Sequence, residues 1–280
     1  MKKTYLNLGC GSRYRPDWIN IDIAPRDPAV IRHDLGRGIP LADESCDVVY
    51  HTAVLEHMRR PEAEIFLSEC CRVMKPGGIL RVGVPDLEKI CRLYLSKLSA
   101  AADGDEAAAR DYDWIMLELF DQVARERSGG DMLDYLRQEP LPNEEFVYER
   151  IGIEGEELVQ ALRGSGAPQS NPPFLRRLRR IAAFVKERVV PRLLGEKGRR
   201  IYEIGRFRLS GEAHHWMYDR YSLARLLRLA GFREPQLQDA HTSRIPGWNS
   251  FHLDTLPDGR VIKPDLFFME AIKPGGSIDD

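Results

Sequence analysis

The chain has 280 residues and a mass of 32.0 kDa, which favours one or two domains with a substantial buried core. Its 43% hydrophobic, 30% charged and 9% aromatic residues exclude a mostly disordered chain. With 41 basic and 43 acidic residues the net charge is −2, so we do not expect a chain built as a whole to bind nucleic acid. No apolar run approaches the ~18 residues that span a bilayer, and the N-terminus lacks the apolar run of a secretory signal.

The cysteines indicate neither a disulfide framework nor a zinc site. They number five, an odd count, and form no CxxC pair. Reduced thiols and a cytoplasmic location fit this pattern best. The five are Cys10, Cys46, Cys70, Cys71 and Cys91.

The first region, residues 1–95, alternates short apolar runs with a helical pattern. Apolar residues recur at helical spacing over 61–74, with acidic and basic residues between them. Strands alternating with helices predict a parallel sheet in an α/β fold. The predicted strands are residues 4–8, 18–23, 47–50 and 79–84.

The middle region, residues 96–211, has a different texture. A helix-favouring stretch, 98–126, is interrupted at 103–105, and a Gly/Ser/Pro-rich loop is predicted over 164–173. Residues 174–194 follow as a basic amphipathic helix.

The last region returns to the first texture, with a helix over 222–229 and closing strands over 236–240 and 266–272. We therefore predict a Rossmann-like, mostly parallel sheet whose core comprises 1–95 and 212–274. Residues 96–211 are predicted to be a mainly helical insertion that forms a lid or recognises the acceptor.

Small and acidic residues follow the first predicted strands. Gly9 and Gly11 flank Cys10, and glycines there let backbone amides approach a ligand, although an ordinary turn explains them equally well. Asp22 ends the next strand, where its carboxylate could accept hydrogen bonds from ribose hydroxyls or cap a turn. Asp34 could lie beside an adenine amino group.

Together these motifs resemble the class I S-adenosylmethionine-dependent methyltransferases, especially the type 11 group. Residues 8–11 are similar to that family's cofactor loop, while 47–50 with 55–57 and 75–78 resemble its fourth strand and the turn before its fifth. The resemblance implies S-adenosylmethionine as the cofactor. It implies cofactor contacts from Leu8, Gly9, Cys10, Gly11, Asp22, Ile23, Asp34, Leu35 and His51.

The chain departs from the family pattern in its cofactor loop. Asn7 and Ser12 replace an acid and a third glycine, and residues 11–18 are too few for a full crossover helix. This contraction suits a cofactor without pyrophosphate and disfavours a dinucleotide, which needs a helix N-terminus. Residues 215–219 and 263–267 resemble features of bacterial enzymes predicted to act in polysaccharide synthesis.

The acceptor side is predicted from a histidine pair before the last helix. His214 and His215 are candidate general bases, because imidazole titrates near neutrality, and Asp219 or Glu212 could orient them. Packing is the alternative for each histidine. His57 is expected to brace its loop, and no cluster with metal-ligand spacing stands out.

The predicted function is O-methylation of a sugar hydroxyl in a glycan or glycolipid precursor. An N- or C-methyltransferase of a small metabolite and a non-catalytic binding or membrane-scaffolding module are the alternatives. The helix at 174–194 has three interpretations: a solvated helix, a peripheral contact with the inner membrane face, or a phosphate-binding element. Nucleic acid is disfavoured, because aromatic residues do not interleave the basic ones.

Overall fold

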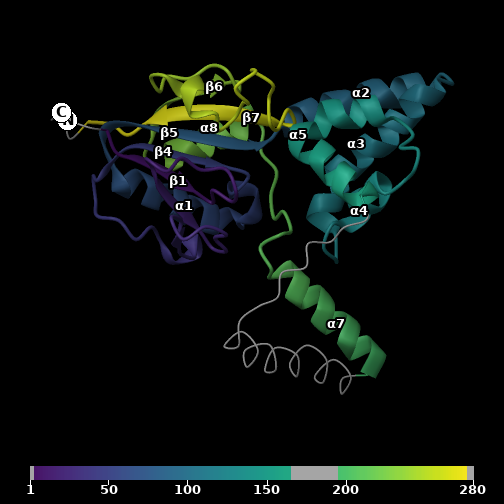
Figure 1. The fold of residues 1–280 in the computed structure, drawn as a ribbon, viewed down its shortest axis with the longest axis horizontal. Helices are drawn as coiled ribbons and strands as arrows, with labels where there is room; N and C mark the ends of the chain where they lie inside the picture. Colours follow the sequence, from purple (N-terminus) through teal and green to yellow (C-terminus); the bar gives the residue numbers. More distant parts are fainter. Residues whose placement is uncertain (1–2, 165–194, 276–280) are drawn as a thin grey trace.

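The computed structural model describes residues 3–164 and 195–275, so the predicted basic helix at 174–194 lies outside the described residues. One seven-stranded sheet has the order β3-β2-β1-β4-β5-β7-β6 (Figure 1). Only β7 runs antiparallel to its neighbours, which confirms the predicted Rossmann-like, mostly parallel sheet. The strands are β1 (Tyr5–Leu8), β2 (Ile19–Asp22), β3 (Ile31–Arg32), β4 (Cys46–Thr52), β5 (Met74–Pro85), β6 (Arg233–Gln238) and β7 (Leu266–Ile272).

One face of the sheet is covered by α1 (Arg60–Val73) and α8 (Arg220–Leu229). The apolar spacing in α1 puts Phe66 and Leu67 on one side, where they pack into the core that the strands share with α8. Asp219 starts α8 by accepting hydrogen bonds from the backbone amides of Tyr221 and Ser222.

Aromatic side chains and a buried ion cluster cover the opposite face. Trp18 and Tyr50 pack here with Trp248, which begins the short helix η3 (Trp248–Phe251). Arg81 is fully buried and pairs with Asp254 and Glu270, each at 2.8 Å. The two carboxylates compensate the guanidinium charge, which could not be buried alone.

A helical lobe with its own core lies beside the sheet, and α7 stands away from it (Figure 1). Trp114 and Ile115 are fully buried in this core, and the buried Arg150–Glu118 pair, at 2.6 Å, links two of its helices. The lobe comprises α2 (Leu87–Ala102), α3 (Glu106–Ala124), α4 (Gly130–Leu136) and α5 (Glu144–Arg163), and α7 (Gly195–Arg208) lies outside it.

The chain passes from the sheet into the lobe and returns to the sheet at neighbouring positions. Asp86 and Tyr218 form a parallel bridge, and the Leu87 amide donates to the Tyr218 carbonyl at 3.1 Å. Helix α2 therefore starts directly after β5 and crosses the boundary predicted at residue 95. The lobe stands at the carboxyl end of β5, the edge where open α/β sheets bind ligands.

The connection from β1 to β2 contains turns and no helix, as its short length predicts. The first helix of the lobe begins earlier than predicted. Apolar and polar residues already follow a helical period from residue 87, and the predicted start at 98 is therefore wrong.

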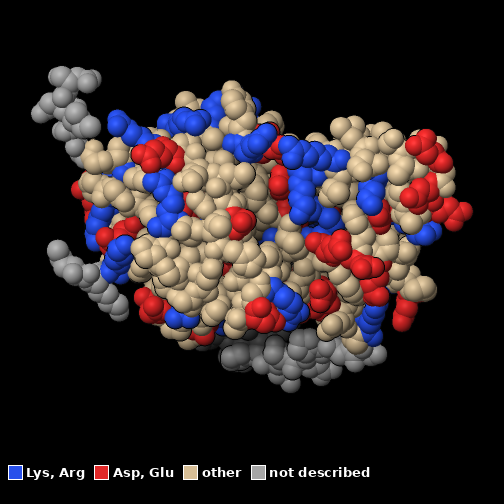
Figure 2. Space-filling model, turned by 90° about the horizontal axis from the view of Figure 1, so that it is seen from above, with Lys and Arg blue, Asp and Glu red and all other residues tan. Residues whose placement is uncertain are grey.

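Charges of both signs share the face in Figure 2, and acidic side chains gather over its right-hand, helical part. Among the described residues, none of the helices is both long and apolar enough to span a membrane.

Candidate functional site

The turn after β1 requires glycine at position 9. Gly9 has φ +64°, and its amide donates to the Ile21 carbonyl at 2.8 Å. A Cβ here would lie 2.4 Å from Cγ2 of Val54. Gly11 also has positive φ, +53°, but a Cβ on it would meet open space within 4 Å. The loop thus presents bare backbone toward an open region at the carboxyl edge of the sheet.

Asp22, at the end of β2, holds this loop. Its carboxylate accepts hydrogen bonds from the amides of Gly11, at 2.9 Å, and Ala24, at 2.7 Å. Of the two roles that the sequence allows for Asp22, the structure shows the capping of a turn. A carboxylate in this position could also accept from ribose hydroxyls, which remains a prediction.

Three other predicted cofactor contacts, Asp34, Ile23 and Leu35, lie away from the cavity beside the glycine turn. Asp34 caps the short helix η1 (Leu35–Arg37), accepts from the Gly36 amide at 3.0 Å, and is exposed. Ile23 is 62% exposed, whereas Leu35 packs against the sheet core. None of the three lines the cavity beside the glycine turn.

His51 is not at the surface of that cavity. It is fully buried against Phe66, with ring centroids 5.1 Å apart, and neither ring nitrogen has a hydrogen-bond partner within the described part of the chain. Burial lowers the pKa of His51 to about 3. The prediction of a cofactor contact is not supported by this position, because the residue's place in β4 turns its side chain to the α1 side of the sheet, away from the cavity.

A cavity of about 200 Å³ lies against residues 9–12. Its walls include Thr52, which ends β4, Ala53 directly after it, and Glu154 from α5. Glu154 pairs with Arg13 at 2.9 Å and with Lys263 at 3.2 Å, so the helical lobe is tied to the loop.

Cys10 lines the same cavity as a protonated thiol. Burial, with the nearby Asp22 carboxylate, raises its pKa to about 11. A thiol with this pKa is a poor nucleophile at neutral pH, so Cys10 serves as part of the wall.

A second cavity, of about 260 Å³, adjoins the first and shares four lining residues with it. Titratable side chains line it from both the core and the lobe, among them Glu56, His57, Glu118, His214 and Asp265. The shared residues are Ala53, Glu154, Lys263 and Leu266.

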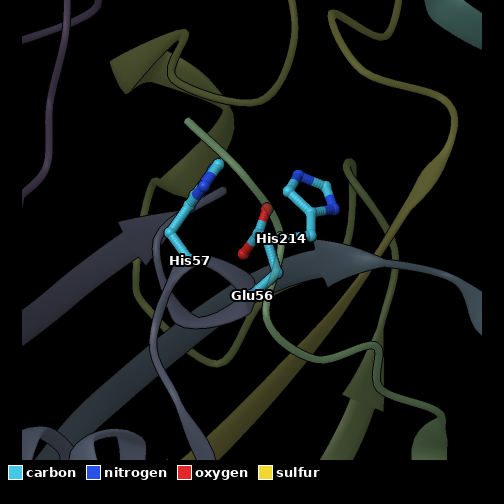
Figure 3. Close-up of side chains that lie close together, drawn as sticks. All are labelled: Glu56, His57 and His214. Carbon is cyan, nitrogen blue, oxygen red and sulfur yellow. The ribbon is translucent and has the colours of Figure 1, made fainter. Parts of the chain in front are cut away.

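Three of these side chains converge in the second cavity (Figure 3): Glu56 and His57 from the short helix η2 (Leu55–His57), and His214 from the returning segment. In the view of Figure 3 the Glu56 carboxylate points between the two imidazoles. Their candidate ligand atoms lie within 4.8 Å of one another. The two rings meet edge to face, with centroids 4.7 Å apart.

Burial dominates the electrostatics of this cluster. It raises the pKa of Glu56 to about 8 and, together with His57, lowers the pKa of His214 to about 3. Burial also lowers the pKa of His57. In this structure, therefore, both imidazoles are neutral at neutral pH and the carboxyl group is largely protonated.

The structure separates the two histidines of the predicted pair. His214 is 7% exposed and lines the second cavity, whereas His215 does not. Asp219 caps α8 and Glu212 accepts from the Gly129 amide at 2.8 Å. Neither acid orients a histidine, because each carboxylate is engaged by backbone amides instead.

Sequence reasoning assigned no role to Glu56, Glu154 or Lys263. Glu56 stands in the motif at 55–57, which was a signal for it. Glu154 and Lys263 come from different regions, and only the tertiary fold brings them to the glycine turn.

The family model described as a methyltransferase domain, of type 11, matches residues 6–82. A probable S-adenosylmethionine-dependent methyltransferase of Mycolicibacterium smegmatis is 36% identical over 99 residues, which cover 29% of this chain and 37% of that protein. The match thus spans little more than a third of the relative's length. Residues 6–82 carry a methyltransferase domain, and the cofactor indicated is S-adenosylmethionine.

Solved structures of two further proteins are similar at low identity. An S-adenosylmethionine-dependent methyltransferase of Thermotoga maritima is 14% identical, with TM-score 0.39, over 98% of this chain and 83% of that one. Another, of Methanosarcina mazei, is 14% identical, with TM-score 0.36, over 98% and 95%.

Proposed function

We propose that the chain is an S-adenosylmethionine-dependent methyltransferase that methylates a sugar hydroxyl of a glycan or glycolipid precursor. The methyltransferase domain at 6–82 supports the cofactor. The observation that carries the reaction is the continuity of two cavities: one lies against the bare glycine turn, and the next is lined by buried polar groups.

The adjoining cavity suits an acceptor rich in hydroxyl groups. Oε2 of Glu56 and Nδ1 of His57 are buried without hydrogen-bond partners, which is costly unless a ligand satisfies them. A sugar offers several donors and acceptors at once, whereas an apolar acceptor would leave these atoms unpaired.

The chemistry is an in-line displacement. The bond from sulfur to the methyl carbon breaks, the bond from that carbon to the acceptor oxygen forms, and the hydroxyl proton leaves. The chain contributes by holding the two reactants in line and excluding water. His214 has its ring at this cavity in the neutral form, which is able to accept that proton. A weak base is sufficient here, because an alkylated hydroxyl is itself strongly acidic.

The test supplies the purified chain with S-adenosylmethionine labelled in the methyl group, together with nucleotide sugars, glycolipid precursors and, separately, small amines. We expect the label on a sugar oxygen, identified by mass spectrometry of the product. Transfer only to nitrogen or carbon would overturn the proposed acceptor. Absence of S-adenosylhomocysteine binding would overturn the enzyme itself.

The matched variants are His214→Ala and His215→Ala. Loss of a positioned proton acceptor lowers turnover by about 10²–10⁴-fold, so His214→Ala should lose turnover to this extent and retain cofactor affinity. His215→Ala should stay active, because His215 does not line the second cavity. Equal activity of the two variants would contradict the role of His214.

A further inference from the structure

We propose that Glu56, His57 and His214 form a binding site for a divalent transition-metal ion in the wall of the second cavity. Two imidazoles and one carboxylate converge from segments that are far apart in the sequence, and all three side chains line that cavity. This donor set is typical of zinc and iron(II) sites that keep positions open for water or substrate.

Two buried atoms of the cluster lack hydrogen-bond partners among the described residues. Oε2 of Glu56 is buried without a hydrogen bond, and the residue is 1% exposed. Nδ1 of His57 is likewise buried and unpartnered. Buried polar atoms without a partner are costly, and a bound metal ion would satisfy them.

Backbone hydrogen bonds fix the two segments against each other. The amides of His215 and Trp216 donate to the Glu56 carbonyl, at 2.7 and 3.3 Å, and the His214 amide donates to the Gln122 carbonyl at 3.0 Å. The three side chains are therefore held close together before any ligand binds. Ligands about 2.1 Å from a tetrahedral ion lie about 3.4 Å apart, so side-chain rotations close the remaining gap.

Carboxyl groups outnumber basic side chains in the lining of the cavity. Its lining contains Glu118 and Glu154, each already paired with a basic residue at 2.6 and 3.2 Å. Within 3–164 and 195–275, Glu56 and Asp265 have no ion pair. Glu56, which is largely protonated at neutral pH, would release its proton on binding the ion. Imidazole ligands favour a transition metal over Mg²⁺ or Ca²⁺.

The consequence for catalysis rests on the proposed function. An acceptor hydroxyl bound at an open position of the ion would have a lowered pKa, and His214 would then act through the metal instead of as a free base.

The test strips the purified full chain of metal with a chelator and titrates Zn²⁺ against a competing chromophoric chelator. We expect one tight site in the wild-type chain and at least about tenfold weaker binding in Glu56→Gln and His214→Ala. His215→Ala, a histidine variant one residue away, should bind as the wild type does, and Mg²⁺ should not compete. Equal binding by all variants, or no binding, would overturn the proposal.

A second measurement covers variants that fail to fold. Co²⁺ added to the stripped wild-type chain should give the visible d–d absorption of a low-coordinate site with nitrogen ligands, and Zn²⁺ should displace it. A spectrum of hexa-aquo type would overturn the proposal. Because neither measurement uses methyl transfer, metal binding and the proposed enzyme activity can fail independently of each other.

Discussion

Replacing Asp22 with alanine tests the link between the glycine turn and the cofactor. In the structure the carboxylate accepts two backbone hydrogen bonds, from the amides of Gly11 and Ala24. Leaving a hydrogen-bonding group without its partner costs about 1–3 kcal/mol. If the carboxylate also accepts from ribose, losing it should weaken S-adenosylhomocysteine binding by about 5–150-fold.

The assay is calorimetric titration of S-adenosylhomocysteine into each variant, with thermal melts alongside. Asp105→Ala is the matched control: Asp105 also accepts two backbone hydrogen bonds, from Ala107 at 2.9 Å and Ala108 at 3.0 Å, but caps α3 in the helical lobe. Both variants should lose similar stability, and only Asp22→Ala should lose affinity. Affinity within twofold of wild type, or equal losses in both variants, would refute the reasoning.

Three further variants test the scaffold. An alanine in the left-handed conformation costs about 1–2 kcal/mol, and Gly9→Ala should lower the free energy of unfolding by more than this, because the added Cβ would also lie 2.4 Å from Val54. The control is Gly11→Ala, whose Cβ meets open space. Urea unfolding compares the two variants, and equal losses would contradict the expectation. Arg81→Met should cost about 3–5 kcal/mol, because it leaves two buried carboxylates unpaired; a loss below about 1 kcal/mol would show that they find other partners. The pKa of His51 is lowered to about 3 in the folded chain, so below about pH 6.5 the unfolded chain binds a proton that the folded chain does not. The wild type therefore loses about 2 kcal/mol of stability at pH 5, and His51→Leu should remove this loss. Unfolding curves at pH 7 and pH 5 measure that difference, and unchanged S-adenosylhomocysteine affinity is expected; a weakened affinity would return His51 to the cofactor site.

Local patterns predicted the sheet and one part of the site. Apolar runs identified every strand of the sheet except the two-residue β3. A glycine turn after one strand and Asp22 at the end of the next lie at one edge, because parallel strands end together. His214, a predicted site residue, lines the second cavity, because it lies where the chain returns to the sheet.

The rest depended on contacts between distant segments. Nothing near Glu154 in the sequence relates it to Arg13, and their ion pair exists only because the helical lobe folds back over the turn. His51 was misplaced for another reason. Successive side chains of a strand point to opposite faces of the sheet. Tyr50 and Thr52 therefore line the cavity, whereas His51 between them points into the buried core.

A crystal structure of the chain with S-adenosylhomocysteine tests the central claim most directly. The account predicts the nucleoside against residues 9–12, with the Asp22 carboxylate accepting from the ribose hydroxyls and the sulfur directed to the cavity that holds His214. A nucleoside bound elsewhere, or a ribose out of reach of Asp22, would contradict it.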